Sequence, residues 1–73
     1  MWIRTQDKKT LVNVRKIYIN KVFKIVSIIG EIASSDSLPI TLGEYESINS
    51  ATVELDSIQN FISEHPTKVY EMK

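Results

Sequence analysis

Apolar and polar residues alternate with a period of two through much of the chain, which is the pattern of strands with one buried face. The segments that follow this pattern are residues 1–6, 10–14, 17–19, 22–29, 40–42 and 67–72. Polar residues 7–9 predict a turn between the first two segments. Asn20 predicts another turn, because asparagine tolerates a positive φ, while Arg15 and Lys16 indicate a break between strands.

The segment 25–29 is rich in β-branched residues and nearly continuous in apolarity, which is typical of a central strand. Alternation along 22–29 sends large apolar groups to both faces of the sheet. The small polar residues 33–37 predict a loop after this strand. We expect a helix to cover one face, in contact with a subset of Val12, Val14, Ile17, Ile19, Ile25 and Ile29.

After Ser47 the period changes from two to about 3.6, which predicts an amphipathic helix over residues 48–64. Ser47 is a suitable N-cap, and Pro66 disfavours helical structure at the residue before it. Glu54 lies off the apolar stripe, so we expect it at the surface and expect its replacement to have little effect. The stripe consists of Ile48, Ala51, Leu55, Ile58 and Ile62, widened by Phe61.

These elements predict one α+β domain over residues 1–73, because a chain of this length has too little interior for two cores. The expected architecture is a small antiparallel sheet of about five or six short strands, a helix near the C-terminus packed on one face, and a short last strand. A core of this size supplies only about 3–5 kcal/mol. Association with a second copy is therefore an expected source of further stability.

Composition restricts the other sources of stability. The chain has no cysteine and one histidine, so disulfides are excluded and the Cys/His ligand set of a structural zinc site cannot be assembled within one chain. No apolar run approaches the roughly 20 residues of a membrane span, and the apolar stretch 23–33 does not fit a secretory signal. We therefore expect a cytoplasmic protein without membrane contact.

The net charge is zero, but the charges are unevenly distributed along the chain. Residues 1–30 contain seven basic residues and one acidic residue, whereas residues 31–73 contain eight acidic and two basic residues. Two interpretations follow. Either folding brings the two halves together so that their charges pair, or one basic face meets an acidic partner or phosphate.

The opening run Met1–Lys8, with residues 10–12 and 17–19, and the later residues 42–45 with Ala51, Leu55 and Ile58 form a further pattern. This pattern resembles a group of short uncharacterised proteins of Gram-positive bacteria and their phages, which begin with a Trp-Ile-Arg-Ser-Gln-Asp-Lys-like run. The resemblance covers about two-thirds of the chain and leaves out residues 21–38. It implies a compact domain of phage or mobile-element origin and transfers no site residue.

Residues that could carry catalysis do not form a recognisable set. His65 stands at the predicted helix end, where an imidazolium interacts favourably with the helix dipole, and no partner for acid or base chemistry accompanies it. Gly30 and Gly43 are isolated, so no phosphate loop is indicated. The acidic pairs Glu44/Glu46 and Glu54/Asp56 are read as solvated surface. We therefore expect neither an enzyme nor a bound cofactor or metal.

Binding of nucleic acid is one of two functions that remain. A basic sheet surface with exposed aromatic rings binds single strands by stacking and phosphate neutralisation. Against this function, the sequence pI of about 6.6 is well below that of a dedicated nucleic-acid binder. The candidate contact residues are Arg4, Lys8, Lys9, Arg15, Lys16, Tyr18 and Lys24.

The leading expectation is a non-enzymatic protein-interaction module that associates with itself. One helix covers only one face of a five- or six-stranded sheet, and the segment 22–29 places apolar groups on both faces. We expect a homodimer formed through an exposed strand edge or through an apolar patch on the sheet face away from the helix.

Overall fold

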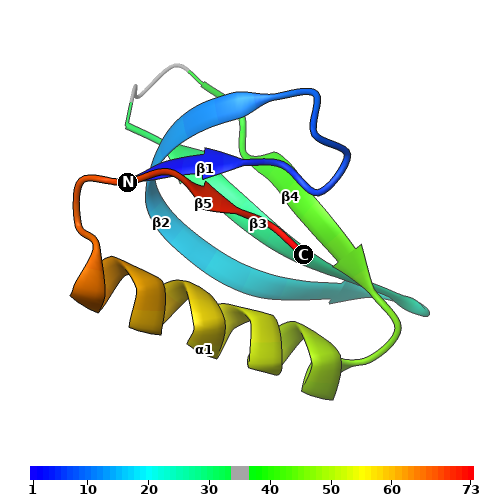
Figure 1. Ribbon diagram of the computed structural model, residues 1–73. Coiled ribbons are helices and arrows are strands. Elements are labelled where there is room, and N and C mark those ends of the chain that lie inside the picture. The colour runs from blue at the N-terminus through cyan, green and yellow to red at the C-terminus, as the bar shows by residue number, and fades with distance from the viewer. Residues whose placement is uncertain (34–36) are drawn as a thin grey trace.

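The computed structural model describes residues 1–33 and 37–73, which form a five-stranded sheet and one helix (Figure 1). The strands are β1 (Trp2–Arg4), β2 (Leu11–Val22), β3 (Ile25–Ile32), β4 (Ile40–Tyr45) and β5 (Tyr70–Glu71), and the helix is α1 (Ile48–Glu64). The strand order is β4-β3-β2-β1-β5, and the sheet is mixed because β5 runs parallel to β1. The predicted α+β class, C-terminal helix and short last strand are confirmed.

Strand β2 is continuous, and a bulge at Arg15 shifts its register between Val14 and Lys16. Val14 is buried, and Ile17 packs against the same core. In a regular strand, residues three apart point to opposite faces, so the extra residue of the bulge is what places both side chains on one face. The expected break between strands at Arg15 and Lys16 is therefore wrong.

The hairpin between β2 and β3 turns later than the sequence suggests. Val22 pairs with Ile25 across a two-residue turn, and Asn20, where we expected the turn, lies within β2 opposite Ser27. Of the six residues from which the core contacts were expected, Val12, Val14, Ile17 and Ile19 contribute to the core. Strand β3 contributes Val26 and Ile28 in place of Ile25 and Ile29. The loop expected at 33–37 includes residues 34–36, which lie outside the described residues.

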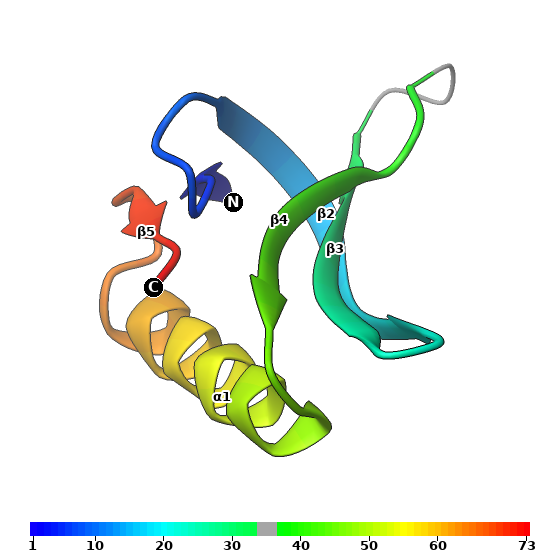
Figure 2. The ribbon, with the colours of Figure 1, turned by 90° about the vertical axis from the view of Figure 1, so that its right-hand side faces the viewer.

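The sheet is strongly curled, and α1 lies across its open side (Figure 2). Side chains on the concave face and on the inner side of α1 form a single core. Among the residues that the structure describes, no helix or strand covers the convex face of β2 and β3. The buried hydrophobic residues are Ile3, Val12, Val14, Val26, Ile28, Leu42, Ala51, Ile58, Tyr70 and Met72.

Helix α1 has the predicted bounds, and local hydrogen bonds fix both ends. The Ser47 hydroxyl accepts a hydrogen bond from the Ser50 amide at 3.1 Å, and the Ser50 hydroxyl accepts one from the Ser47 amide at 3.2 Å. This reciprocal pair satisfies amides that have no partner in the first turn. At the other end the His65 amide donates to the Phe61 carbonyl at 2.7 Å, directly before Pro66.

Gln6 joins the two edges of the curled sheet. Its amide donates to the Leu42 carbonyl at 2.9 Å, and its side chain both accepts from the Glu44 amide at 2.9 Å and donates to the Glu44 carbonyl at 3.2 Å. The same side-chain nitrogen donates to the Lys73 carbonyl at 3.0 Å. These bonds occupy part of the outer edge of β4, which would otherwise be open to pairing with another chain.

Glu54 lies in the interior, contrary to the sequence expectation, and is only 6% exposed. One carboxylate oxygen accepts hydrogen bonds from the Tyr70 hydroxyl at 3.0 Å and from the Lys73 amide at 2.8 Å. Burial of a carboxylate is costly unless hydrogen bonds replace its hydration, and both donors come from the C-terminal segment. Glu54 therefore holds β5 and the residues after it against α1.

Two tyrosines near Glu54 resist ionisation. Burial, together with the negative charge of Glu54, raises the pKa of Tyr45 to about 12. Burial also raises the pKa of Tyr70, and the hydrogen bond from its hydroxyl to Glu54 adds to this shift. Both hydroxyls remain protonated at a pH where a tyrosine in an unfolded chain has begun to ionise.

Glu54→Ala is expected to lower the free energy of unfolding by about 2–3 kcal/mol, because the Tyr70 hydroxyl and the Lys73 amide lose a charged acceptor. Urea denaturation followed by circular dichroism measures this change. Asp56→Ala is the control, since Asp56 is exposed on the same helix, and should alter stability by less than about 0.5 kcal/mol. Equal stability of the two variants would contradict the structural role of Glu54.

Stability is expected to fall as the pH rises from about 10 toward 12. In this range the tyrosines of the unfolded chain lose their protons, whereas Tyr45 keeps its proton until about pH 12. The stabilisation is thus complete below pH 10 and is lost as the pH rises through the folded-state pKa. Urea midpoints measured at successive pH values test this, and Tyr45→Phe should make the decline shallower. A midpoint that stays constant over this range would argue against buried, protonated tyrosines.

Candidate interaction surfaces

The turn between β2 and β3 projects an apolar surface into solvent. Val22 is 53% exposed, Phe23 is 93% exposed and Ile25 is 57% exposed. We call these three residues the hairpin-tip patch. Single exposed apolar residues are common on protein surfaces, but three at one turn, including a nearly fully exposed phenylalanine, form a contiguous site of the kind that marks an interaction surface.

The backbone at Phe23 is strained, because its φ is +54°. Phe23 is the first central residue of the two-residue turn, and the second, Lys24, is not among the non-glycine residues with positive φ. This is the pattern of a type II′ turn, in which glycine usually takes the first position. A bulky residue in this conformation costs on the order of 1–3 kcal/mol, and its exposed ring recovers none of this cost by burial in the monomer.

Charges of both signs lie beside the hairpin-tip patch. A groove of about 500 Å³ separates the turn from the start of α1, with Lys21 and Lys24 on the hairpin side and Glu46 on the other. None of these three side chains forms an ion pair within the described residues. Ile48, which we expected in the buried stripe of α1, is instead 49% exposed and adds an apolar side chain to the same groove. The surface around the turn thus combines apolar, basic and acidic groups.

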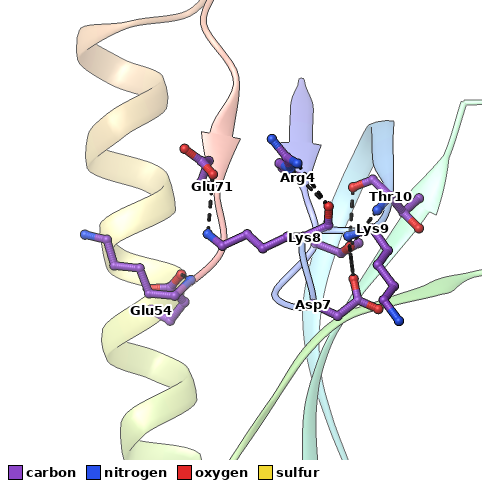
Figure 3. A network of polar contacts seen from close by, with 9 residues as sticks. Arg4, Asp7, Lys8, Lys9, Thr10, Glu54 and Glu71 are labelled. Atoms are coloured by element: carbon purple, nitrogen blue, oxygen red, sulfur yellow. Dashed lines mark hydrogen bonds and ion pairs between the residues drawn. The ribbon is translucent and has the colours of Figure 1, made fainter.

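The candidate nucleic-acid contacts do not form one surface. Arg4, Lys8 and Lys9 line a hollow of about 380 Å³ at the turn between β1 and β2, and Glu71 lies in the same hollow. Lys8 forms an ion pair with Glu71 at 3.3 Å, and the Arg4 guanidinium donates to the Lys8 carbonyl at 3.1 and 3.2 Å (Figure 3). Two of the three cations here are thus already engaged.

The same turn has a local framework of its own. Asp7 accepts hydrogen bonds from the Thr5 hydroxyl at 2.6 Å and from the Lys9 amide at 2.9 Å, and these bonds lower the pKa of the Asp7 carboxyl. The left-handed conformation of Lys8, with φ +68°, aims its side chain toward Glu71 (Figure 3). Lys8 therefore links this turn to β5, and Arg4 stabilises the backbone of the turn.

The remaining candidates lie on β2 and at its tip. Arg15, at the bulge, pairs with Glu31 at 3.5 Å, and the ammonium group of Lys16 lies 5.4 Å from the centre of the Tyr18 ring. Lys24 lies at the hairpin tip. Asn20 and Val22, which follow Tyr18 on the same face of β2, are uncharged and separate Lys24 from Lys16 and Tyr18. The ion pairs of Lys8 and Arg15 both join the basic half of the chain to the acidic half. These two ion pairs agree with the first interpretation of the charge pattern, in which folding pairs the charges of the two halves.

Three further features concern metal binding, His65 and the possibility of a membrane-spanning helix. Within residues 1–33 and 37–73, no three His, Cys, Asp or Glu side chains come close enough together to hold a metal ion. The His65 ring packs 5.2 Å from the centre of the Phe61 ring at the end of α1. In the part of the chain that the structure describes, no helix is both long and apolar enough to cross a membrane.

Comparison of the chain with protein-family models, with curated proteins and with solved structures finds no match in any of the three.

Phe23→Gly is expected to raise the free energy of unfolding of the monomer by about 0.5–1 kcal/mol, because glycine adopts the positive φ without steric cost. Urea denaturation at low micromolar protein concentration measures this gain. Leu38→Gly is the matched control, since Leu38 is 85% exposed and has no positive φ. Destabilisation by Phe23→Gly would mean that the Phe23 ring supports the monomer after all.

Proposed function

We propose that this chain is a non-enzymatic protein-interaction module that forms a two-fold homodimer through the hairpin-tip patch. The observation that carries the proposal is Phe23, which is 93% exposed although its backbone adopts a conformation that favours glycine. Burial of this ring against a second copy offsets the local strain. Each large side chain removed from water contributes roughly 1.5–3 kcal/mol, which is considerable for a domain of this size.

The charge distribution around the patch favours a second copy as the occupant. A two-fold interface brings the same surface of both protomers together, so it must be complementary to itself. Lys21 and Lys24 lie on one side of the groove beside the patch and Glu46 on the other. A two-fold rotation can therefore place the basic side of each copy against the acidic side of its partner, around the apolar centre.

Pairing through the edge of an outermost strand, β4 or β5, is less favoured as the route to the dimer. One outer strand, β4, already has the Leu42 carbonyl and both backbone groups of Glu44 bonded to Gln6. The other outer strand, β5, has two residues and is followed by Lys73, whose amide is bonded to Glu54. Short and blocked edges are common protection against edge pairing.

Sedimentation equilibrium between about 10 and 100 μM, at low salt and near 1 M salt, tests the proposal. At 1 M the screening length is about 3 Å, so association that depends on the apolar patch persists whereas purely ionic association disappears. Phe23→Gly should leave a stable monomer, and Leu38→Gly should leave the dimer intact. A wild-type monomer at both salt concentrations would falsify the proposal, as would a Phe23→Gly variant that associates like the wild type.

Single-stranded nucleic-acid binding through Arg4, Lys8, Lys9, Arg15, Lys16, Tyr18 and Lys24 is the alternative function. An electrophoretic shift of a labelled oligonucleotide at low salt, abolished near 1 M salt, would favour it. The dispersal of these residues over three separate places and the ion pairs of Lys8 and Arg15 argue for the interaction module instead.

We include in the proposal a cytoplasmic location, which follows from the apolar pattern of the sequence. We also include the phage or mobile-element origin that the resemblance of the opening run implies. The genes that neighbour the coding sequence test the origin directly. A prophage cassette would support it, and a housekeeping operon would contradict it.

A further inference from the structure

Strand β2 has a free backbone edge along its second part. Up to the bulge it pairs with β1, from Arg4 opposite Leu11 to Trp2 opposite Asn13, and the Val14 amide donates to the Met1 carbonyl. Beyond the bulge it pairs with β3 on one side only. Within the described residues, no backbone group outside β3 is bonded to the segment 16–22.

The pairing pattern identifies which groups face the free edge. The residues that close a two-residue hairpin, here Val22 and Ile25, exchange both of their backbone hydrogen bonds. Bonded and unbonded pairs then alternate along an antiparallel ladder. Ile17 and Ile19 are therefore in the unbonded pairs, and their N–H and C=O groups point away from β3, toward the open edge.

This edge borders a groove of about 330 Å³ between β2 and α1. Its apolar lining consists of Met1, of Ile17 from β2, and of Leu55, Ile58 and Ile62 from α1. A strand edge next to a helix with an apolar face is the arrangement that binds extended peptides by β-augmentation, in which backbone hydrogen bonds provide affinity and side-chain pockets provide specificity.

The charged side chains that line the groove are both basic, Arg15 and Lys16. Arg15 has Glu31 at 3.5 Å, whereas Lys16 has no carboxylate within ion-pair distance among the described residues. The helix side adds the neutral Gln59 and Ser63. A ligand that fits this groove therefore has apolar side chains and a negative charge.

We propose that the groove binds an extended peptide segment of another protein, with alternating apolar side chains and an acidic residue, as an added strand on β2. The segment's backbone bonds to Ile17 and Ile19, its apolar side chains pack on Leu55 and Ile62, and its carboxylate pairs with Lys16. The ligand is extended because the N–H and C=O groups of an extended peptide repeat at the same spacing as those of Ile17 and Ile19. The groove shares no lining residue with the one beside the hairpin-tip patch, so the two sites are distinct.

Selection from a library of random eight-residue peptides tests the proposal, with the full chain attached to the support through its C-terminus. Enriched peptides should carry apolar residues at every second position together with Asp or Glu. A synthetic peptide of the enriched sequence should slow hydrogen exchange of the Ile17 and Ile19 amides at least about tenfold, since an exposed strand edge exchanges freely. The same peptide with N-methyl groups on alternate amides should bind weakly.

Lys16→Gln should lower the affinity for the enriched peptide by up to about fivefold, the range for an exposed ion pair. Lys9→Gln is the control, because Lys9 is exposed and lies outside the groove, and it should retain the affinity. Failure to enrich any peptide, enrichment of peptides with apolar residues at helical spacing, or exchange at Ile17 and Ile19 that binding leaves unchanged would each overturn the proposal. An equal loss of peptide affinity in Lys16→Gln and Lys9→Gln would also overturn the proposal, because it would indicate nonspecific charge attraction.

Discussion

Much of the structure depends on the bulge at Arg15 in β2, although the pairing of β3 with β4 also shifts register between Ile28 and Ile29. The apolar residues of this strand change phase between Val14 and Ile17, and only an extra residue keeps both on the inner face. The bulge also increases the local twist, so that the first part of β2 pairs with β1 and the second part with β3 in a curled sheet. The curl brings β4 close enough to Gln6 for their hydrogen bonds, and it leaves an open side that α1 covers (Figure 2). The free edge of β2 and the projecting hairpin both follow from this geometry.

Polar contacts to Lys73 stabilise the arrangement of the sheet and helix that follows from the bulge. Gln6 and Glu54 each bind Lys73, one at its carbonyl and the other at its amide, so the C-terminal residue connects the sheet to the helix. Tyr45 adds a third contact, from its hydroxyl to the same carbonyl at 3.0 Å. Because Glu54 is buried, its bonds to Tyr70 and Lys73 are made in a low-dielectric region where hydrogen bonds are strong and an unpaired group is costly. The contacts of Gln6 and Tyr45 with the Lys73 carbonyl lie at the surface. A domain without disulfides thus gains order at its C-terminus from a small polar network.

The helix was predictable because each of its signals is local: the 3.6 period, the Ser47 cap and Pro66. The misplaced features depend on contacts between distant residues. Arg15 and Lys16 look like a break because a bulge has the same composition as a polar interruption. The turn at Phe23 was missed because Asn20 suits a positive φ better, and with that turn misplaced, nothing along the apolar run 25–29 identified the inner face. Glu54 lies off the apolar stripe, and the donors that justify its burial come from Tyr70 and Lys73, which no helical pattern reveals. Of the candidate contacts, the sequence located the basic residues but not their ion pairs.

The two proposed surfaces have a common physical basis. Each contains a feature that lowers the stability of the free domain, namely the backbone strain at Phe23 and the unbonded backbone groups of β2. A sequence selected for stability alone would place glycine or asparagine at residue 23. It would also bury or block the edge of β2, as Gln6 does for β4. Backbone strain and unsatisfied edges are typical of sites where binding supplies the missing contacts. Burial of one ring would offset the backbone strain at Phe23, which suits a compact symmetric interface. The unbonded groups of Ile17 and Ile19 require the backbone of a partner instead. This difference in chemistry is why we propose a folded second copy for the hairpin tip and an extended segment for the groove.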